Sequence, residues 1–361
     1  MKKLILFIVS VFMIASCKEQ QDQMSGFLVF DFPKKDVTQS IPIDSIVEKT
    51  SMIQLDTSSS APIIGGITLL YESENAYFVV SDGVVVYEYD KAGKFVRQIG
   101  ATGRGPGEYL SVGGIYSNKK DSSVIVFDFP GQTVLKYDNQ GRFINSCKPQ
   151  LSDSLLYLTS FFPNQDTLIF YASNNSSGMD LLQYNEMDGT MSAISTKDRS
   201  MLPEEAIMCK IFSFGDRVNP FIYNYFNDTV YVLKNKKLTP SFLMQLGDYR
   251  FGYEELTIDK LMALQKSKIN LQWIVCGGNY LFISYSISQM EGKKGKQFLA
   301  LYNTQTKEYM QNIEITNVAD EYSAIVPGKK LFQGFLPNEL LSVKNVSDTD
   351  NRSILIKYKM K

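Results

Sequence analysis

The sequence predicts an all-β fold made of repeated four-stranded antiparallel units, and three observations support this. Aromatic and β-branched residues recur in short runs that turn residues separate. A strand, an Asp-x-x-Gly turn and a second strand follow one another more than once along the chain. Such copies return with a period of about 40–50 residues, which is typical of propeller blades. The number of copies favours a six-bladed β-propeller.

The first 16 residues are typical of a secretory signal peptide. Lys2 and Lys3 precede an apolar run at residues 4–15. A helix of that length rises about 18 Å, which is too short for a hydrocarbon core of about 30 Å. Small residues then mark a cleavage site directly before Cys17. The chain is therefore expected to be exported, with residues 1–16 removed.

Residues 14–17 (IASC) resemble a bacterial lipobox, in which the cysteine is acylated and becomes the new N-terminus. The resemblance implies a lipid anchor on Cys17 and a tether over residues 17–25. Lys18 stands where aspartate favours inner-membrane retention in such lipoproteins, so the outer membrane is expected. The side of the membrane that the protein faces stays open. An ordinary signal peptide with an incidental cysteine is the alternative.

Residues 26–361 are expected to form the propeller. The first unit has strands at residues 67–71, 76–80 and 84–90, a turn that ends at Gly93, and a further strand. The second unit has the same order from residue 114 onward, with its turn glycine at Gly141. Glycine supplies the positive φ that such tight hairpins need.

Weaker copies of the third strand continue along the chain at residues 180–185, 229–234 and 299–303. Five residues are taken as equivalent, with steps of 48, 47, 49 and 69 residues between them: Tyr89, Tyr137, Tyr184, Leu233 and Tyr302. The long last step contains apolar residues at helical spacing, so a helical insertion is expected near residues 250–268. Removing about 20 residues for this insertion restores the period.

The last unit ends on a strand at residues 354–358, and no fourth strand follows it. An early strand at residues 51–55 precedes the first full unit. It is predicted to supply the missing fourth strand, which closes the ring and pairs both open edges. Five full units and one shared unit make six blades.

Residues 103–109 (GRGPGEY), with residues 98–100 before them, resemble the signature loop of six-bladed β-propeller lipoproteins from gut-type Gram-negative anaerobes. Residues 226–231 and 238–240 are also similar to that family, as is the helical insertion. The resemblance covers nearly all of the mature chain. It implies an NHL-like propeller in the cell envelope and says little about activity.

Charge and composition exclude several classes of function. Acidic and basic residues nearly balance, 38 against 37, and no long basic run gives a footprint for nucleic acid. The chain has no histidine, which rules out a Ser-His-Asp triad and histidine-ligated zinc. At most one disulfide can form among three cysteines, and thiols packed as small hydrophobic groups are favoured: Cys147, Cys209 and Cys276.

The GRGPGEY loop is the first candidate site. Its glycines free the backbone, Arg104 offers a forked donor, Glu108 offers a carboxylate, and Tyr109 adds an aromatic ring. The loop is a candidate contact for a ligand or partner. The alternative is a turn between blades, with Arg104 and Glu108 paired to neighbouring loops.

A second candidate is an aromatic surface. On a strand, Phe221, Tyr223 and Tyr225 share one face and could contact a sugar ring or a peptide. Packing between twisted sheets is the alternative. No cofactor is expected, although convergent aspartates at Asp82, Asp128 and Asp228 are candidates for a Ca²⁺ site. Capping of turns by the same side chains is the alternative.

The sequence therefore favours a lipid-anchored envelope protein that binds or scaffolds. It would recognise a glycan, a peptide or a partner protein through the propeller face, and it touches the membrane only through its anchor. The alternative is a propeller hydrolase, lactonase or lyase that uses carboxylates or Ca²⁺ at the central channel. Because no catalytic residues can be named, enzymatic activity is not the favoured hypothesis.

Overall fold

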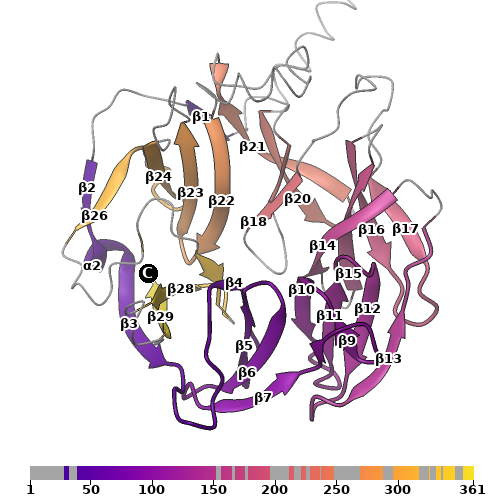
Figure 1. The fold of residues 1–361 in the computed structure, drawn as a ribbon. Coiled ribbons are helices and arrows are strands. Elements are labelled where there is room, and N and C mark those ends of the chain that lie inside the picture. The colour runs from indigo at the N-terminus through magenta and orange to yellow at the C-terminus, as the bar shows by residue number, and fades with distance from the viewer. Residues whose placement is uncertain are drawn as a thin grey trace, which may run out of the picture.

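Six antiparallel sheets surround a common centre in the computed structural model of the chain (Figure 1). The structure describes residues 28–31, 39–151, 156–164, 167–174, 178–195, 211–214, 221–224, 228–235, 237–247, 269–287, 296–316, 325, 331–334, 336–345 and 353–361. The expected signal peptide (residues 1–16), the tether (residues 17–25) and the expected helical insertion near residues 250–268 lie outside these residues.

Blades I to III follow one another along the chain, and in each the strands pair in sequence order. Blade I consists of β4 (Ile67–Glu72), β5 (Ala76–Ser81), β6 (Val85–Asp90) and β7 (Phe95–Ile99). Blade II consists of β10 (Val112–Ser117), β11 (Val124–Asp128), β12 (Thr133–Tyr137) and β13 (Phe143–Cys147). Blade III consists of β14 (Leu156–Asn164), β15 (Thr167–Asn174), β16 (Gly178–Tyr184) and β17 (Met191–Ser195).

Blades IV and V continue the same pattern. Blade IV consists of β18 (Ile211–Phe214), β19 (Phe221–Asn224), β20 (Thr229–Lys234) and β21 (Lys237–Gln245). Blade V consists of β22 (Ile269–Gly277), β23 (Tyr280–Ile287), β24 (Lys296–Asn303) and β25 (Tyr309–Met310). One additional strand, β1 (Leu28–Asp31), pairs in parallel with the outer side of β21 and widens blade IV to five strands.

Blade VI closes the ring. It consists of β27 (Phe332–Gln333), β28 (Glu339–Asn345), β29 (Ser353–Met360) and, as its fourth strand, β3 (Val47–Gln54) from the N-terminal part of the chain. β3 pairs with β29 along its whole length, from Gln54 opposite Ile354 to Val47 opposite Met360. The predicted closure is confirmed, and so is the six-bladed β-propeller.

Short elements complete the chain outside the blades. A four-residue helix, α2 (Ile43–Ile46), leads into β3, and β2 (Gln39–Pro42) pairs in parallel with β26 (Ile313–Thr316) beyond blade V. β8 (Ala101–Thr102) pairs in parallel with β9 (Glu108–Tyr109) inside the GRGPGEY region. No helix among the described residues has the length and hydrophobicity needed to cross a membrane.

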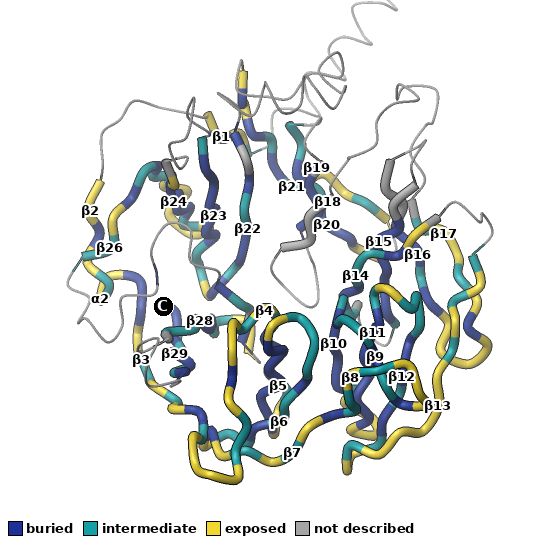
Figure 2. The backbone as a smooth tube through the Cα atoms, viewed as in Figure 1, coloured by how far each residue is buried: buried dark blue, intermediate teal, exposed yellow. Residues whose placement is uncertain are grey.

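The second strands of blades I and II lie between strands of their own blade and the adjacent blades, so they are buried on both sides (Figure 2). All residues of β5 and β11 are buried, whereas every residue of the outermost strand β13 is at least partly exposed. This explains the continuous apolar runs that mark second strands in the sequence. The predicted equivalent residues all lie on third strands and are buried: Tyr89, Tyr137, Tyr184, Leu233 and Tyr302, joined by Tyr358.

The two faces of the ring differ in the length of their connections. On one face, here called the entry face, each innermost strand begins, and the connections from the preceding blade run from eight residues (148–155) to 23 residues (246–268). On the other, the exit face, the innermost strands end in turns of two to six residues, such as 278–279 and 118–123. Long connections on a rigid scaffold are the usual carriers of binding function.

Hairpins between the third and fourth strands also join neighbouring blades. Gly93 and Gly141 both have positive φ, of 77–86°, as the Asp-x-x-Gly pattern predicts. A Cβ on Gly93 would lie 2.2 Å from the carbonyl oxygen of Gln54, at the end of β3. A Cβ on Gly189, in the third blade, would lie 2.3 Å from Sγ of Cys147, at the end of β13. Glycine is needed there for contact between blades as well as for the turn.

Candidate functional site

The GRGPGEY loop leads from the outermost strand of blade I to the innermost strand of blade II, and its carboxylate folds back on it. The Gly105 amide donates to Oε2 of Glu108 at 2.8 Å, and the Glu108 amide donates to the Gly105 carbonyl. A Cβ on Gly103 would lie 2.0 Å from that Oε2. The Glu108 side chain therefore stabilises the turn, and the lack of a side chain at Gly103 leaves room for the Glu108 carboxylate.

Tyr109 anchors the loop in the boundary between the two blades. Its side chain is fully buried, and its hydroxyl donates to the Ile99 carbonyl at 2.6 Å and accepts from the Val86 amide at 3.1 Å. Burial raises the pKa of Tyr109 to about 12. From blade II, the Tyr137 hydroxyl donates to the Gly107 carbonyl at 3.1 Å. These contacts use Tyr109 for packing and hydrogen bonding inside the protein.

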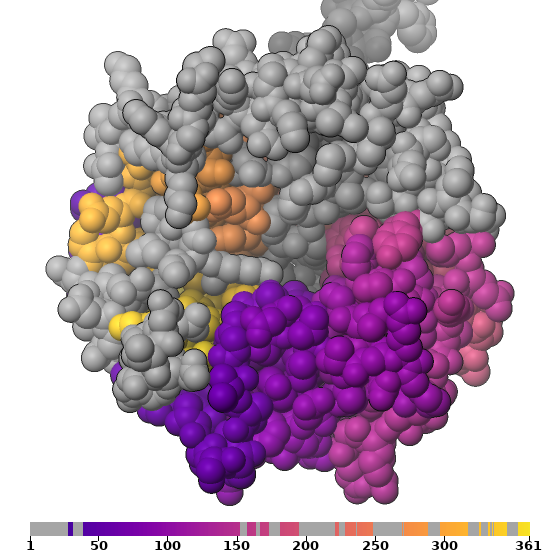
Figure 3. Space-filling model, viewed as in Figure 1, coloured from indigo at the N-terminus to yellow at the C-terminus, as the bar shows by residue number. Residues whose placement is uncertain are grey.

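Arg104 is the charged side chain that this arrangement leaves on the surface. It lies in the exposed stretch of residues 104–106, between the anchored positions. The start of the loop is tied to the entry face, because the Thr102 hydroxyl donates to the Val84 carbonyl in the turn between β5 and β6. The residues of blades I and II form one continuous surface in the space-filling view (Figure 3). A guanidinium on a fixed backbone can form a bidentate contact with a carboxylate or phosphate.

Asp82 and Asp128 occupy equivalent places at the ends of the second strands of blades I and II. Asp82 accepts from the Gly66 amide at 2.7 Å, and Asp128 accepts from the Leu110 and Ser111 amides at 3.0 and 3.2 Å. Each carboxylate thus ties down the connection that enters its own blade. Among the described residues, no three acidic or cysteine side chains gather as metal ligands would.

The candidate aromatic surface lies inside the protein as far as it is described. Phe221 and Tyr223 on β19 are 8% and 1% exposed and belong to the largest hydrophobic core cluster. The Phe221 ring packs against Phe242 of β21, with ring centroids 5.8 Å apart. Tyr225 lies outside the described residues, as do Cys17 and Cys209, whereas Cys147 and Cys276 are partly buried thiols. The packing alternative accounts for Phe221 and Tyr223.

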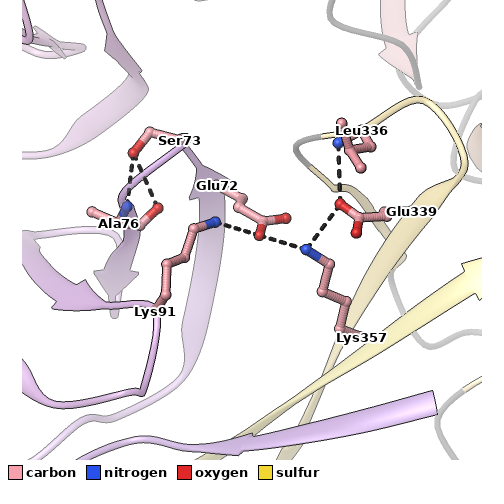
Figure 4. A network of polar contacts seen from close by, with 7 residues as sticks. All are labelled: Glu72, Ser73, Ala76, Lys91, Leu336, Glu339 and Lys357. Carbon is pink, nitrogen blue, oxygen red and sulfur yellow. Dashed lines mark hydrogen bonds and ion pairs between the residues drawn. The ribbon is translucent and has the colours of Figure 1, made fainter. Parts of the chain in front are cut away.

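Glu72 is the one acidic residue in the described parts of the six innermost strands, and it lies where blade VI meets blade I (Figure 4). Its carboxylate is fully buried and contacts two lysines, Lys91 at 2.5 Å and Lys357 of β29 at 2.9 Å. Lys357 also contacts Glu339 at 2.8 Å. Burial by itself would raise the pKa of Glu72, but the two lysine contacts outweigh it and lower that pKa. The network links both sides of the ring closure.

A pocket of about 240 Å³ lies on the exit face between blades I and II, and its lining contains none of the candidate site residues predicted from the sequence. Its lining includes Tyr71, Glu88, Ser122 and Asn139 from four different elements. One signal was available: Glu88 interrupts the apolar and aromatic run VVYEY of β6. The sequence could not show that Glu88 and Asn139 come together, because they lie in different blades.

With six four-stranded antiparallel blades and a ring that its own N-terminal strand closes, the protein is a six-bladed β-propeller. The chain belongs to the family described as Domain of unknown function (DUF4934), whose model matches residues 27–355. No curated protein matches it in sequence.

Two solved structures share the architecture. One is described as an exported protein from Bacteroides fragilis, with 17% identity, a TM-score of 0.64, and coverage of 92% of this chain and 99% of that one. The other is a member of the DUF4221 family from Bacteroides vulgatus, with 11% identity, a TM-score of 0.58, and coverage of 87% and 97%. At these identities the likeness shows the fold alone.

Proposed function

We propose that the protein is an exported binding or scaffold module, anchored to the outer membrane through acylated Cys17. It recognises a glycan, a peptide or a partner protein through the entry face. One observation carries this proposal: the GRGPGEY loop has a backbone fixed by Glu108 and Tyr109 and leaves Arg104 exposed. A fixed loop loses little conformational entropy on binding, which favours affinity.

The partner class follows from Arg104. Its guanidinium suits an acidic group, such as the carboxylate of a peptide or of an acidic sugar. Two features support a binding surface on this face. The long connections between blades begin and end there, and the ring beneath them is closed by the pairing of β3 with β29.

The test is a thermal stability screen of the full-length protein against acidic glycans and envelope-derived peptides. A ligand that binds the native state raises Tm by mass action. Arg104→Glu should abolish the shift that the best ligand produces, while the Tm of the unliganded protein stays unchanged. Lys94→Glu is the matched control, since it makes the same charge change at an exposed turn outside the loop. A shift that survives in Arg104→Glu contradicts the proposal for this face.

The anchor is tested separately. Cys17→Ser removes the acylated thiol, so the protein should leave the membrane fraction and appear in the soluble fraction. Stable anchoring needs more than one acyl chain, at about 0.8 kcal/mol for each buried methylene. Unchanged membrane association of Cys17→Ser would contradict lipidation at this residue and leave the binding test unaffected.

A further inference from the structure

One wall of the pocket between blades I and II is formed by Tyr71, Phe78 and Glu88, which belong to a single row of paired residues across blade I. Tyr71 on β4 pairs with Phe78 on β5, which pairs with Glu88 on β6, which pairs with Arg97 on β7. Directly paired residues point to the same side of a sheet. The wall is therefore aromatic near the centre of the ring and charged toward the outside.

This row faces blade II. The Tyr71 hydroxyl donates to the Ser117 carbonyl at 3.3 Å, and its ring meets Tyr116 edge to face at 5.9 Å. Blade II supplies the opposite wall from two turns of the exit face: Asn118 and Ser122 from the first, and Asn139 from the second. The pocket, about 240 Å³, is smaller than the roughly 300–1,000 Å³ of sites for drug-sized ligands. It has room for one small ring.

The charges around the pocket are paired. Oε2 of Glu88 lies 2.9 Å from Nε of Arg97, and the Glu88 side chain is 16% exposed. Burial raises the pKa of Glu88, and the Arg97 charge opposes this. At the rim, Glu74 and Lys119 contribute one charge of each sign. The pocket therefore does not favour an ion of either sign, and a neutral polar ligand fits it best.

Several polar groups in the lining have no partner among the described residues. The side chains of Asn75, Ser122 and Asn139 form no hydrogen bond there, and the Arg97 contact leaves Oε1 of Glu88 unused. Amides and hydroxyls both donate and accept hydrogen bonds, and a carboxylate accepts two or more. Next to them, Tyr71 and Phe78 offer apolar ring surface.

We propose that this pocket binds one neutral sugar residue. A sugar ring carries hydroxyls that donate and accept, which match the amides, Ser122 and Oε1 of Glu88, and it has apolar C–H faces that match the aromatic wall. The site does not rest on the function proposed for the entry face, because it opens on the opposite face. The sugar is either free or a residue at the end of a longer glycan.

The experiment is saturation-transfer NMR on the full-length protein, in a detergent without a sugar headgroup. The probes are methyl glycosides of neutral hexoses and of N-acetylhexosamines, with uronic acids and amino sugars as charged comparisons. A neutral sugar is expected to bind at millimolar or lower concentration. An oligosaccharide that ends in the same sugar then distinguishes a free sugar from a chain end, and either result supports the site.

Two variants locate the binding. Glu88→Gln should weaken it about tenfold or more, and Asn139→Ala about three- to tenfold, as expected for one charged and one neutral hydrogen bond. Arg97→Gln is the control for Glu88, because it breaks the same ion pair and leaves the carboxylate in place. Gln140→Ala is the control for Asn139, since it lies in the same turn outside the pocket. Arg97→Gln should weaken binding by less than tenfold, and Gln140→Ala by less than threefold.

Three results would overturn the proposal. The first is that no neutral sugar binds, and the second is that only charged sugars bind. The third is that the sugar binds equally well to Glu88→Gln, Asn139→Ala and the unaltered protein. Arg104→Glu also serves as a control here, since it alters only the entry face. Failure of the sugar site therefore stays distinguishable from failure of the function proposed above.

Discussion

Tyr109 and Glu72 are both polar side chains at the boundaries between blades, and each is bound by several groups. Tyr109 holds the GRGPGEY loop to the backbone of blade I through two hydrogen bonds. Glu72 joins blade I to Lys357 of blade VI and to Lys91 of its own blade. Buried polar groups stabilise a fold when they are fully bonded and destabilise it when they lose a partner. The blade boundaries are therefore sensitive to single substitutions.

Glu72 should make stability depend on pH. Its pKa in the folded state is below the ordinary value of 4.5, so its contribution is present in full above pH 4.5. It is lost as pH falls from about 4.5 through the lower folded pKa, because the unfolded state binds the proton more readily. Glu72→Gln should therefore lower the free energy of unfolding at pH 7, by at most about 3–5 kcal/mol. This gap between the variant and the unaltered protein should narrow below pH 4.5.

Urea unfolding of both proteins between pH 7 and pH 3.5 measures this gap. Glu48→Gln is the control, because the Glu48–Lys359 pair is about half exposed and should contribute little at any pH. A gap between Glu72→Gln and the unaltered protein that stays constant with pH would contradict the assigned role of the charge.

At the scale of elements, the third-to-fourth-strand hairpins serve two purposes. In blades I and II an aspartate at the start of the turn accepts from two backbone amides, as Asp90 does from Ala92 and Lys94 and Asp138 from Gln140 and Arg142. The glycine of each turn then touches the end of the preceding blade's outermost strand. The Asp-x-x-Gly turn, whose repetition indicates the blades in the sequence, therefore also contacts the neighbouring blade.

Substitutions at two glycines should separate the effect of backbone strain on stability from the effect of close contact. Gly83 and Gly93 both have positive φ, 75° and 86°, but a Cβ on Gly83 meets nothing within 4 Å. Gly83→Ala should cost only the penalty for left-handed backbone, about 1–2 kcal/mol. Gly93→Ala should cost about 1–3 kcal/mol more, because the Cβ would press on the Gln54 carbonyl and displace β3. Chemical unfolding of both variants measures the difference, and equal costs would contradict this account.

At the scale of the whole molecule, stability depends on a closure that joins distant parts of the chain. β3 pairs with β29 across about 300 residues of sequence, and the Lys361 amide donates to the Ile46 carbonyl at 3.0 Å. Without β3, the edge of β29 would be open to pairing with other chains. This seam, the pairing of β3 with β29, is stabilised by backbone hydrogen bonds, and the contact between Glu72 and Lys357 ties β29 to blade I.

A covalent link across this seam should stabilise the protein. Lys49 and Lys359 lie opposite each other on β3 and β29, where Lys49 is exposed and Lys359 is partly exposed. Directly paired antiparallel residues have Cα atoms about 4.5–5.5 Å apart, within the range for a disulfide. Lys49→Cys with Lys359→Cys should form one on oxidation and raise the free energy of unfolding by up to about 5 kcal/mol. The reduced sample is the control for Tm, and failure to form the bond would contradict the register.

Local patterns in the sequence were enough to predict the fold class, the number of blades and the closing strand. Those features depend on local patterns: alternating apolar runs, Asp-x-x-Gly turns, and a last unit that lacks one strand while an early strand is left over. Strand pairing within a hairpin is set by residues close in sequence, so such patterns carry it.

Which residues are available for binding depends on how the blades pack together in three dimensions. From the sequence, Phe221, Tyr223 and Tyr109 fit a binding surface as well as they fit internal packing, because aromatic side chains suit both roles. The structure buries all three and leaves Arg104 exposed. It also brings Glu88 of blade I to the same pocket as Asn139 of blade II. The contact between blades is set by how twisted sheets pack around a ring, and no local pattern in the chain encodes it.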